Sequence, residues 1–232
     1  MIYYQSIRMS INIKFYSLLF VLGFALICGM VRFVILDKGS KIVFYSLAME
    51  FISEICAHAA AVKWHTNFLV YSIAAIVEYC FLCWYFNIVI DEFHKYNTGF
   101  YIGIAGVLFG ILNIVFLQPL NSYDSNFLLL EGVSAILMSL YAFYRLLITR
   151  GWLHLFYYQH FWFISSYLIY WTITFLSFGF YNTIMLVMSS KLWIIDIILW
   201  FSGIILYTGI SIIFILYPKL KDKQCTINLL SN

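Results

Sequence analysis

Long apolar segments alternate with short polar stretches along the whole chain. A helix of about 20 mostly apolar residues spans the hydrocarbon core of a bilayer. The predicted spans are 15–36, 42–62, 68–90, 99–117, 127–148, 161–188 and 192–217. Transmembrane β-barrels instead alternate polar and apolar residues over segments of about ten. The pattern predicts an all-α, polytopic membrane bundle of seven transmembrane helices, which forms one integral membrane domain over residues 1–232.

The composition excludes most soluble classes. The chain is 64% apolar and 10% charged, with a mean hydropathy of +0.94. A soluble domain is about half apolar and a quarter charged. The lipid bilayer is therefore the expected environment. The basic residues form no run that could follow a phosphate backbone, so we expect no nucleic-acid partner.

Lysine and arginine positions predict the orientation, because cytoplasmic span ends collect them. One side carries Arg32, Lys38, Lys41, Lys95, Arg145, Arg150, Lys219, Lys221 and Lys223. The other side carries Arg8, Lys14, Lys63 and Lys191. We therefore expect the N-terminus outside and the C-terminus in the cytoplasm.

Several acidic residues lie deep inside the predicted spans, where a charged side chain costs roughly 2.5–3.5 kcal/mol on insertion scales. Glu50, Glu54 and His58 are four residues apart, so a helix places them on one face. They lie about 18, 12 and 6 Å below the outer end of their span, and Glu78 lies about 15 Å below the outer end of the next. No Lys or Arg lies as deep, so these carboxylates must be protonated, share protons or bind a cation from outside.

Other spans add polar residues near their outer ends. The candidate pocket residues are Glu50, Glu54, His58, Glu78, Asn113, Glu131, Asn182 and Asp196. The inner half of the spans carries no group of comparable polarity except Asn87. We expect a pocket that opens outward, has Glu50 and Glu78 at its floor, and binds a proton, a cation or a small ligand.

Simpler roles stay open for the same residues. A protonated Glu that bonds to a neighbouring helix fastens the two helices, which is worth about 0.6 kcal/mol on average. Glu131 and Asp196 could simply face water near the interface. His58, Glu54 and Glu78 are the weak metal candidates, because one histidine with two carboxylates is a poor zinc signature. We predict no metal site and identify no cofactor.

Four glycines of the fourth span are spaced four, three and four residues apart: Gly99, Gly103, Gly106 and Gly110. This spacing places them on one helix face, where the lack of side chains lets another backbone approach closely. They predict a helix-packing seam.

Enzyme motifs are scarce. The chain has no HExxH, no Gly-rich phosphate loop and no GxSxG sequence. Seven-helix hydrolases that resemble ceramidases use a histidine in the last helix, and microbial rhodopsins use a lysine there. Neither residue occurs between Leu192 and Pro218. The sequence favours a protein that is not an enzyme.

The second and third spans carry a resemblance. The stretch 49–54, then Asn67-Phe68-Leu69-Val70-Tyr71 and Ile76-Val77-Glu78-Tyr79, resembles small seven-helix inner-membrane proteins of Bacteroidetes. In those proteins an acidic helix precedes an Asn-x-x-x-Tyr start and an Ile-Glu-Phe-like core, with Tyr79 in place of Phe here. The resemblance implies a bacterial inner-membrane location and no particular activity.

Three functions remain in view. The one-sided pocket favours a sensory or accessory module that passes a signal to a protein partner in the membrane. The deep acids also suit a proton- or cation-coupled transporter, although inverted repeats and broken helices at matched positions are absent. The third is a membrane-embedded hydrolase or transferase acting on a lipid, with Glu54 or Glu78 as the general acid or base.

Overall fold

The computed structural model describes residues 2–118, 123–150, 155–187 and 192–230, and within them every regular element is a helix. The helices are α1 Ile2–Arg32, α2 Lys38–Trp64, α3 Phe68–Val89, α4 Asp91–Tyr96, α5 Thr98–Leu112, α6 Ser125–Arg150, α8 Gln159–Gly179, α9 Tyr181–Val187 and α10 Leu192–Leu230. A π-helical turn, η1 Asn113–Leu117, extends α5. Seven helices in these residues are long and apolar enough to cross a membrane. The predicted all-α class is confirmed, and so is the number of seven helices of membrane-spanning length within the described residues.

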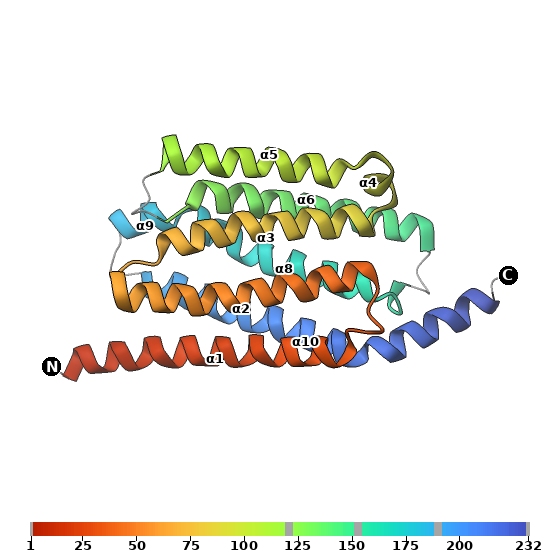
Figure 1. The fold of residues 1–232 in the computed structure, drawn as a ribbon, viewed down its shortest axis with the longest axis horizontal. Coiled ribbons are helices and arrows are strands. Elements are labelled where there is room, and N and C mark those ends of the chain that lie inside the picture. The colour runs from red at the N-terminus through yellow and green to blue at the C-terminus, as the bar shows by residue number, and fades with distance from the viewer. Residues whose placement is uncertain (1, 119–122, 151–154, 188–191, 231–232) are drawn as a thin grey trace.

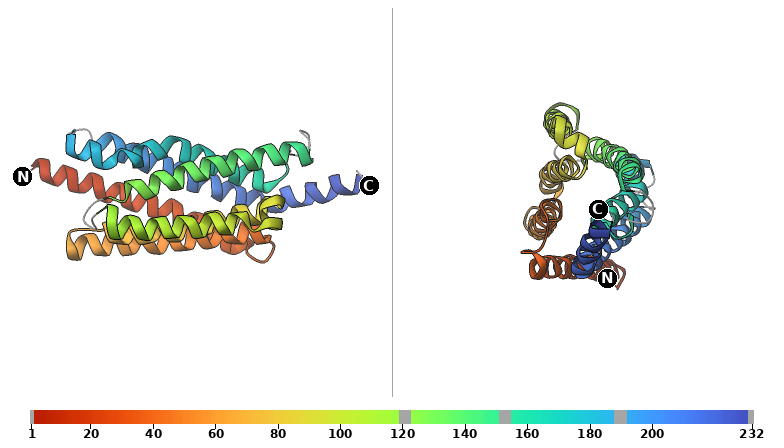
Figure 2. Two further views of the ribbon diagram at one scale, coloured as in Figure 1. Left: turned by 90° about the horizontal axis from the view of Figure 1, so that it is seen from above. Right: turned by 90° about the vertical axis from the view of Figure 1, so that its right-hand side faces the viewer.

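Six of the long helices form a closed ring (Figure 1; Figure 2, right). Each helix of the ring contacts the next in the order α1, α2, α3, α6, α8 and α10, and α10 contacts α1 to close the ring. The helix α5 lies outside this ring and packs mainly against α3. The two chain termini lie at opposite ends of the bundle. We call the end where α1 begins the N-terminal end, and the end where α1 stops the C-terminal end.

The glycine face of α5 packs directly on α3. A Cβ on Gly99 would lie 2.6 Å from Asn87 Cβ, and one on Gly106 would overlap the Tyr79 ring. The Asn87 side chain also accepts a hydrogen bond from the Gly99 backbone N–H at 3.1 Å. The missing side chains therefore let α5 sit close against the ring.

The predicted span 161–188 is two helices, and its last residue lies outside the described ones, as does Lys191. The helix α8 ends at Gly179, and the Phe180 backbone N–H turns back to the Leu176 carbonyl at 3.0 Å. The residues on both sides of this break are apolar, so hydropathy cannot register it.

The prediction that the last helix ends before Pro218 is wrong, since α10 continues through it to Leu230. Proline removes one helical hydrogen bond, and membrane helices tolerate that loss where neighbouring groups compensate. The first span also ends earlier than predicted, at Arg32, because turns at 33–35 lead into α2.

The half of the ring toward the C-terminal end is filled with apolar and aromatic side chains. Fully buried members of this core are Leu22, Ala25, Val43, Phe86, Phe163, Ile164, Ile210 and Phe214. Interiors packed in this way leave few voids larger than a water molecule. This half of the bundle is therefore closed.

We expect Gly106→Ala to lower the free energy of unfolding by about 1–3 kcal/mol, because the new methyl group overlaps the Tyr79 ring. The matched control is Gly103→Ala, whose Cβ would meet Cys83 Cβ at 3.3 Å and needs only a small adjustment. Thermal unfolding in detergent, followed by tryptophan fluorescence, compares the two. Equal midpoints would contradict the close packing of α5 on α3 at Tyr79.

Candidate functional site

A cavity of about 430 Å³ lies within the ring, in the half toward the N-terminal end. All six ring helices and α9 contribute lining residues. It extends from Asn67 and the exposed Asp196 at its rim to Glu50, Glu78 and Tyr207. The last three lie near the middle of their spans. The structure thus brings a polar cavity to the depth at which a bilayer is most apolar.

Five of the eight predicted pocket residues line this cavity: Glu50, Glu54, His58, Glu78 and Asp196. The first three follow one face of α2, as their spacing requires. Glu78 faces the same space from α3. The charges of Glu54 and Glu78 both act on Glu50, so the three carboxyls form one electrostatic group.

Tyrosine hydroxyls bind two of the three deep carboxyls. Tyr71 donates to Glu54 Oε2 at 3.2 Å, and Tyr207 donates to Glu50 Oε1 at 3.3 Å. Both distances exceed the usual value of about 2.7–2.8 Å for such bonds. Glu78 makes no hydrogen bond within the described residues. These carboxyls therefore keep acceptor capacity that the cavity can offer to a ligand.

The rim of the cavity carries a cation. Lys14 lines it and interacts electrostatically with Asp196, and the Trp200 indole donates to the Lys14 carbonyl at 3.0 Å. His58 stacks on Phe15 with ring centroids 4.1 Å apart. Among the described residues no group of three or more His, Cys, Asp or Glu side chains could hold a metal ion.

Asn113 and Asn182 lie outside this cavity. Asn113 bonds to Asp124 and donates to Gln118 Oε1 at 2.9 Å. Asn182 donates to the Tyr123 carbonyl at 2.7 Å. Burial raises the pKa of Asp124, although the bond from Asn113 acts against this. Asn113 therefore ties η1 to the residues just before α6, and Asn182 ties α9 to the same residues.

Glu131 is also outside the cavity. It is fully buried on α6, and neither of its carboxylate oxygens has a hydrogen-bond partner within the described chain. Hydropathy predicts the position of Glu131 along its span, but it carries no information on the face of α6 on which the side chain lies.

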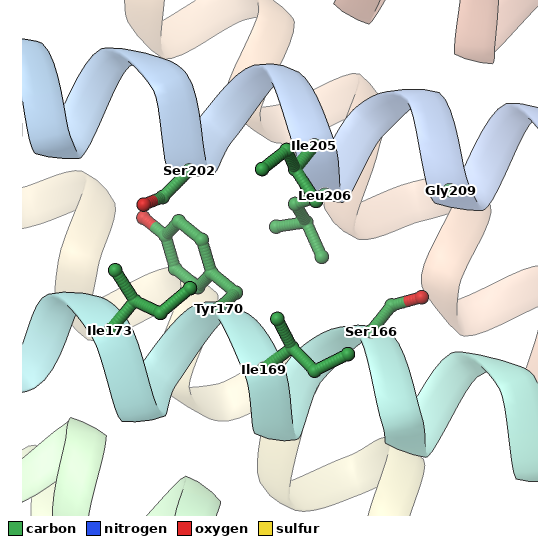
Figure 3. A pocket seen from close by; sticks show the side chains of 8 residues that line it. All are labelled: Ser166, Ile169, Tyr170, Ile173, Ser202, Ile205, Leu206 and Gly209. Atoms are coloured by element: carbon green, nitrogen blue, oxygen red, sulfur yellow. The ribbon is translucent and has the colours of Figure 1, made fainter.

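A second cavity of about 100 Å³ separates α8 from α10 (Figure 3). Its lining is mainly aliphatic, with Ile169, Ile173 and Ile205 among its residues. Tyr170 lines both cavities, so its ring forms part of the wall between them. The Ser202 hydroxyl donates to the Ile198 carbonyl at 2.7 Å and is satisfied there. This smaller space offers little polar chemistry.

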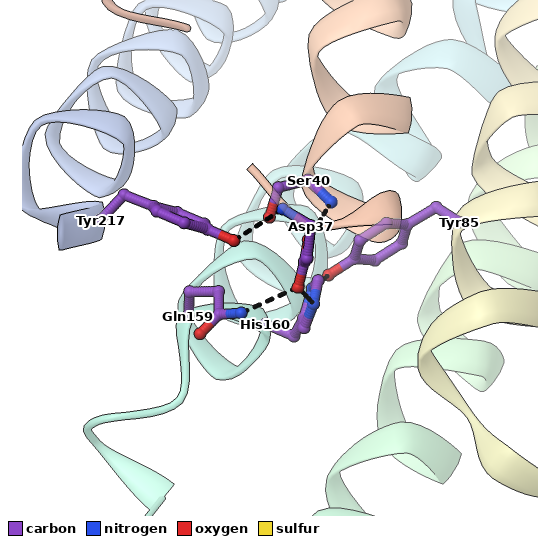
Figure 4. A network of polar contacts seen from close by, with 6 residues as sticks. All are labelled: Asp37, Ser40, Tyr85, Gln159, His160 and Tyr217. Atoms are coloured by element: carbon purple, nitrogen blue, oxygen red, sulfur yellow. Dashed lines mark hydrogen bonds and ion pairs between the residues drawn. The ribbon is translucent and has the colours of Figure 1, made fainter. Parts of the chain in front are cut away.

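A polar cluster that the sequence analysis missed lies at the C-terminal end (Figure 4). We call it the Asp37 network; its members are Asp37, Ser40, Tyr85, Gln159, His160 and Tyr217. Asp37 Oδ2 lies 2.7 Å from His160 Nε2 and accepts from Gln159 Nε2 at 2.9 Å. Asp37 Oδ1 accepts from the Ser40 N–H at 2.8 Å and caps α2.

The other contacts tie this network to α3 and α10. The Asp37 backbone N–H donates to the Tyr217 hydroxyl at 2.8 Å, and the Tyr85 hydroxyl lies 3.3 Å from His160 Nδ1. Burial acts to raise the pKa of Asp37. The hydrogen bond and charge of His160, together with Ser40, outweigh it and hold that pKa well below its ordinary value.

The sequence did not predict that this end of the bundle is polar and buried. His160, the second residue of α8, is 4% exposed and contacts Asp37 ahead of α2 and Tyr85 of α3. The sequence carried one usable signal, an Asp three residues before a Ser at the start of a span, which is typical of a helix N-cap. The pairing of Asp37 with His160 depends on how the helices assemble.

The chain matches no protein-family model, and no curated protein or solved structure is significantly similar to it.

We expect Asp37→Asn to lower stability near neutral pH by about 1–2 kcal/mol, discounted because the Asp37 side chain is 37% exposed. The folded-state pKa lies below the unfolded value of about 3.9, so this stabilisation is present above about pH 4 and is lost in more acidic solution. The difference between the two unfolding midpoints should therefore stay constant from about pH 7 to pH 4 and shrink progressively as the pH falls below about 4.

The control for this experiment is Asp91→Asn, because Asp91 is exposed and forms no ion pair within the described residues. Its midpoint should follow the wild type at every pH. A difference between wild type and Asp37→Asn that stays constant with pH would show that the charge of Asp37 contributes nothing.

Proposed function

We propose that the protein is a sensory or accessory membrane module, whose cavity binds a small ligand, a cation or a proton from outside the cell. The observation that supports this most is the cavity itself, with three carboxyls at or near the middle of the spans and a rim at one end of the bundle. Intramembrane carboxyls are costly and commonly mark a functional site.

The closed half of the ring favours binding over transport. A transporter needs a path that can open on the other side, and transporters place broken helices around such sites. Below Glu50 and Glu78 the interior is filled by the apolar core that includes Leu22, Val43 and Phe214. The Asp37 network adds a polar tie at the C-terminal end.

Helices shared by the two polar regions provide a route for a signal. The helix α2 carries Glu50 and Ser40, α3 carries Glu78 and Tyr85, and α10 carries Tyr207 and Tyr217. A change in the charge of the cavity could shift these three helices relative to one another. Such a shift would also move the residues of the Asp37 network, because the same helices carry them. The ends beyond this network would contact a partner protein in the membrane.

The orientation belongs to the same proposal. The excess of Lys and Arg at the C-terminal end makes that end cytoplasmic, so the cavity faces outward. The resemblance in α2 and α3 adds a bacterial inner membrane as the location.

The orientation predicts the behaviour of two C-terminal fusions expressed in a bacterium. A fluorescent protein that folds only in the cytoplasm should be bright, and an alkaline phosphatase that folds only in the periplasm should be inactive. The opposite pair of results would turn the cavity toward the cytoplasm.

The binding function predicts that pH or a cation changes the stability of the wild type. A species that binds only the folded state at 100 times its dissociation constant adds about 2.7 kcal/mol. Thermal unfolding is measured with and without sodium, calcium, zinc and a chelator, over about pH 5 to 8, where ordinary carboxyls are already ionised. The double variant Glu54→Gln, Glu78→Gln should lose these responses.

Amide hydrogen exchange tests whether the signal travels. Conditions that shift the wild-type midpoint should also change exchange at residues 33–41, and the double variant should show no such change. If the unfolding midpoint shifts but amide exchange at residues 33–41 does not change, the protein binds a ligand but does not transmit a signal to the C-terminal end. The wild-type unfolding midpoint could instead be the same under all conditions, with the double variant at least as stable as the wild type. That result would show that the acids only hold neighbouring helices together.

A further inference from the structure

We propose that the cavity ligand is a small organic ammonium ion, with its charged nitrogen among Glu50, Glu54 and Glu78. This inference deepens the proposed binding function and rests on it. The argument uses the free acceptors of the cavity, its size, its aromatic wall and one unused donor.

The deep carboxyls have acceptors that match an ammonium group. Within the described residues, Glu54 has one carboxylate oxygen without a donor and Glu78 has two, whereas Glu50 accepts from Tyr207 and also interacts with the Ser53 hydroxyl. None of the three forms an ion pair there. A primary ammonium carries a positive charge and three N–H donors, so it can satisfy several of these oxygens at once.

The cavity is too large for a bare metal ion. Its volume of about 430 Å³ is in the range of about 300–1,000 Å³ that is typical of small-molecule sites. Glu54 bonds to Tyr71 of α3 and Glu50 bonds to Tyr207 of α10, so the two carboxyls bond toward different helices. Among the described residues the acids do not converge as metal ligands. The space around them is large enough for an organic body.

Aromatic side chains supply the wall for that body. Tyr170 and Trp171 from α8, and Trp200 and Tyr207 from α10, line the cavity with the carboxyls. Faces of Trp and Tyr attract a cation, which adds about 0.5–1 kcal/mol at exposed sites and about 2 or more when desolvated. The Trp200 ring is fixed, since its N–H donates to Lys14 O and to Ser17 Oγ.

Trp171 provides an observation independent of the acids. Only 3% of this residue is exposed, it lines the cavity, and its indole N–H has no hydrogen-bond partner within the described residues. This N–H is not one of the unpartnered polar atoms that the protein encloses fully, so it keeps access to the cavity. A ligand that carries an acceptor oxygen or nitrogen on its body would satisfy this donor.

Lys14 does not neutralise the deep carboxyls. It lines the rim, where its charge acts on Asp196. The floor of the cavity therefore carries carboxyls without a cation beside them, and the rim carries both an acid and a lysine. This arrangement favours a ligand that enters with its ammonium group toward Glu50 and Glu78.

Isothermal titration calorimetry of the full chain in detergent tests the ligand class. The probes are 2-phenylethylamine, the neutral 2-phenylethanol of the same shape, sodium and calcium. The amine should bind about tenfold or more tightly than the alcohol, because only the amine pairs with the carboxyls. Glu78→Gln should weaken amine binding by about tenfold or more and leave alcohol binding unchanged.

Two further variants make the test specific. Asp91→Asn removes an acid at the far end and should leave amine binding unchanged. Trp171→Phe keeps a ring and removes the unused N–H. It should weaken the binding of tyramine, whose phenol oxygen can accept a hydrogen bond, more than the binding of 2-phenylethylamine, which has no acceptor. Since Glu78 has no hydrogen bond to lose within the described residues, Glu78→Gln should remain folded.

Amine binding measured in nanodiscs of two lipid compositions shows whether the natural ammonium group belongs to a lipid or to a free amine. If phosphatidylethanolamine nanodiscs abolish amine binding and phosphatidylglycerol nanodiscs preserve it, the natural ligand is a lipid headgroup. If both preserve it, the ligand is a free amine. Both outcomes support the ammonium class.

Three results would overturn the proposal, and they separate it from the proposed function. Equal binding of the amine and the alcohol would assign the cavity to a neutral ligand. Binding of sodium or calcium without the amine would assign it to a metal ion; in both cases the binding function stands. If none of the probes binds and the unfolding midpoint does not change with pH, the proposed binding function is rejected as well.

Discussion

The constraint on which this fold depends is the cost of a carboxyl group in hydrocarbon. Glu50, Glu54 and Glu78 lie on spans that the bilayer surrounds, and an unsatisfied polar group there costs several kcal/mol. A ring of six helices solves the problem, because it encloses a space that the three side chains can share. Tyr71 and Tyr207 then provide donors from neighbouring helices. The rest of the architecture follows from keeping that space enclosed.

The two halves of the ring differ in their physical character. Toward the N-terminal end the interior is a polar cavity, and toward the C-terminal end it is a packed apolar core closed by the Asp37 network. The proposed binding function rests on this asymmetry, since a pathway through the membrane would need an opening at both ends. The glycine seam of α5 stands apart from both, since it attaches a seventh helix to the outside of the ring.

The sequence predicted the features that depend on local spacing. Seven apolar segments gave seven spanning helices, and the four-residue spacing of Glu50, Glu54 and His58 placed them on one face. Depth alone was a weaker guide. Glu131 and Asn113 lie at the expected distances from the ends of their helices but do not line the cavity. Hydropathy carries no information on the helix face that meets the ring interior. In the Asp37 network, Asp37 bonds to His160 and to Tyr217, which lie 123 and 180 positions further along the sequence. Only the assembled bundle brings these residues together.

The most direct test of this account is the reach of water into the ring from one end. In a background without the five native cysteines, Ala74→Cys places a thiol on the cavity wall and Ala25→Cys places one in the packed core. A membrane-impermeant, charged thiol reagent is then added to each side of oriented vesicles. The account predicts that Ala74→Cys reacts from the side of the N-terminal end alone and that Ala25→Cys reacts from neither side. Reaction of Ala25→Cys, or of Ala74→Cys from both sides, would show a continuous aqueous path and contradict the closed half of the ring.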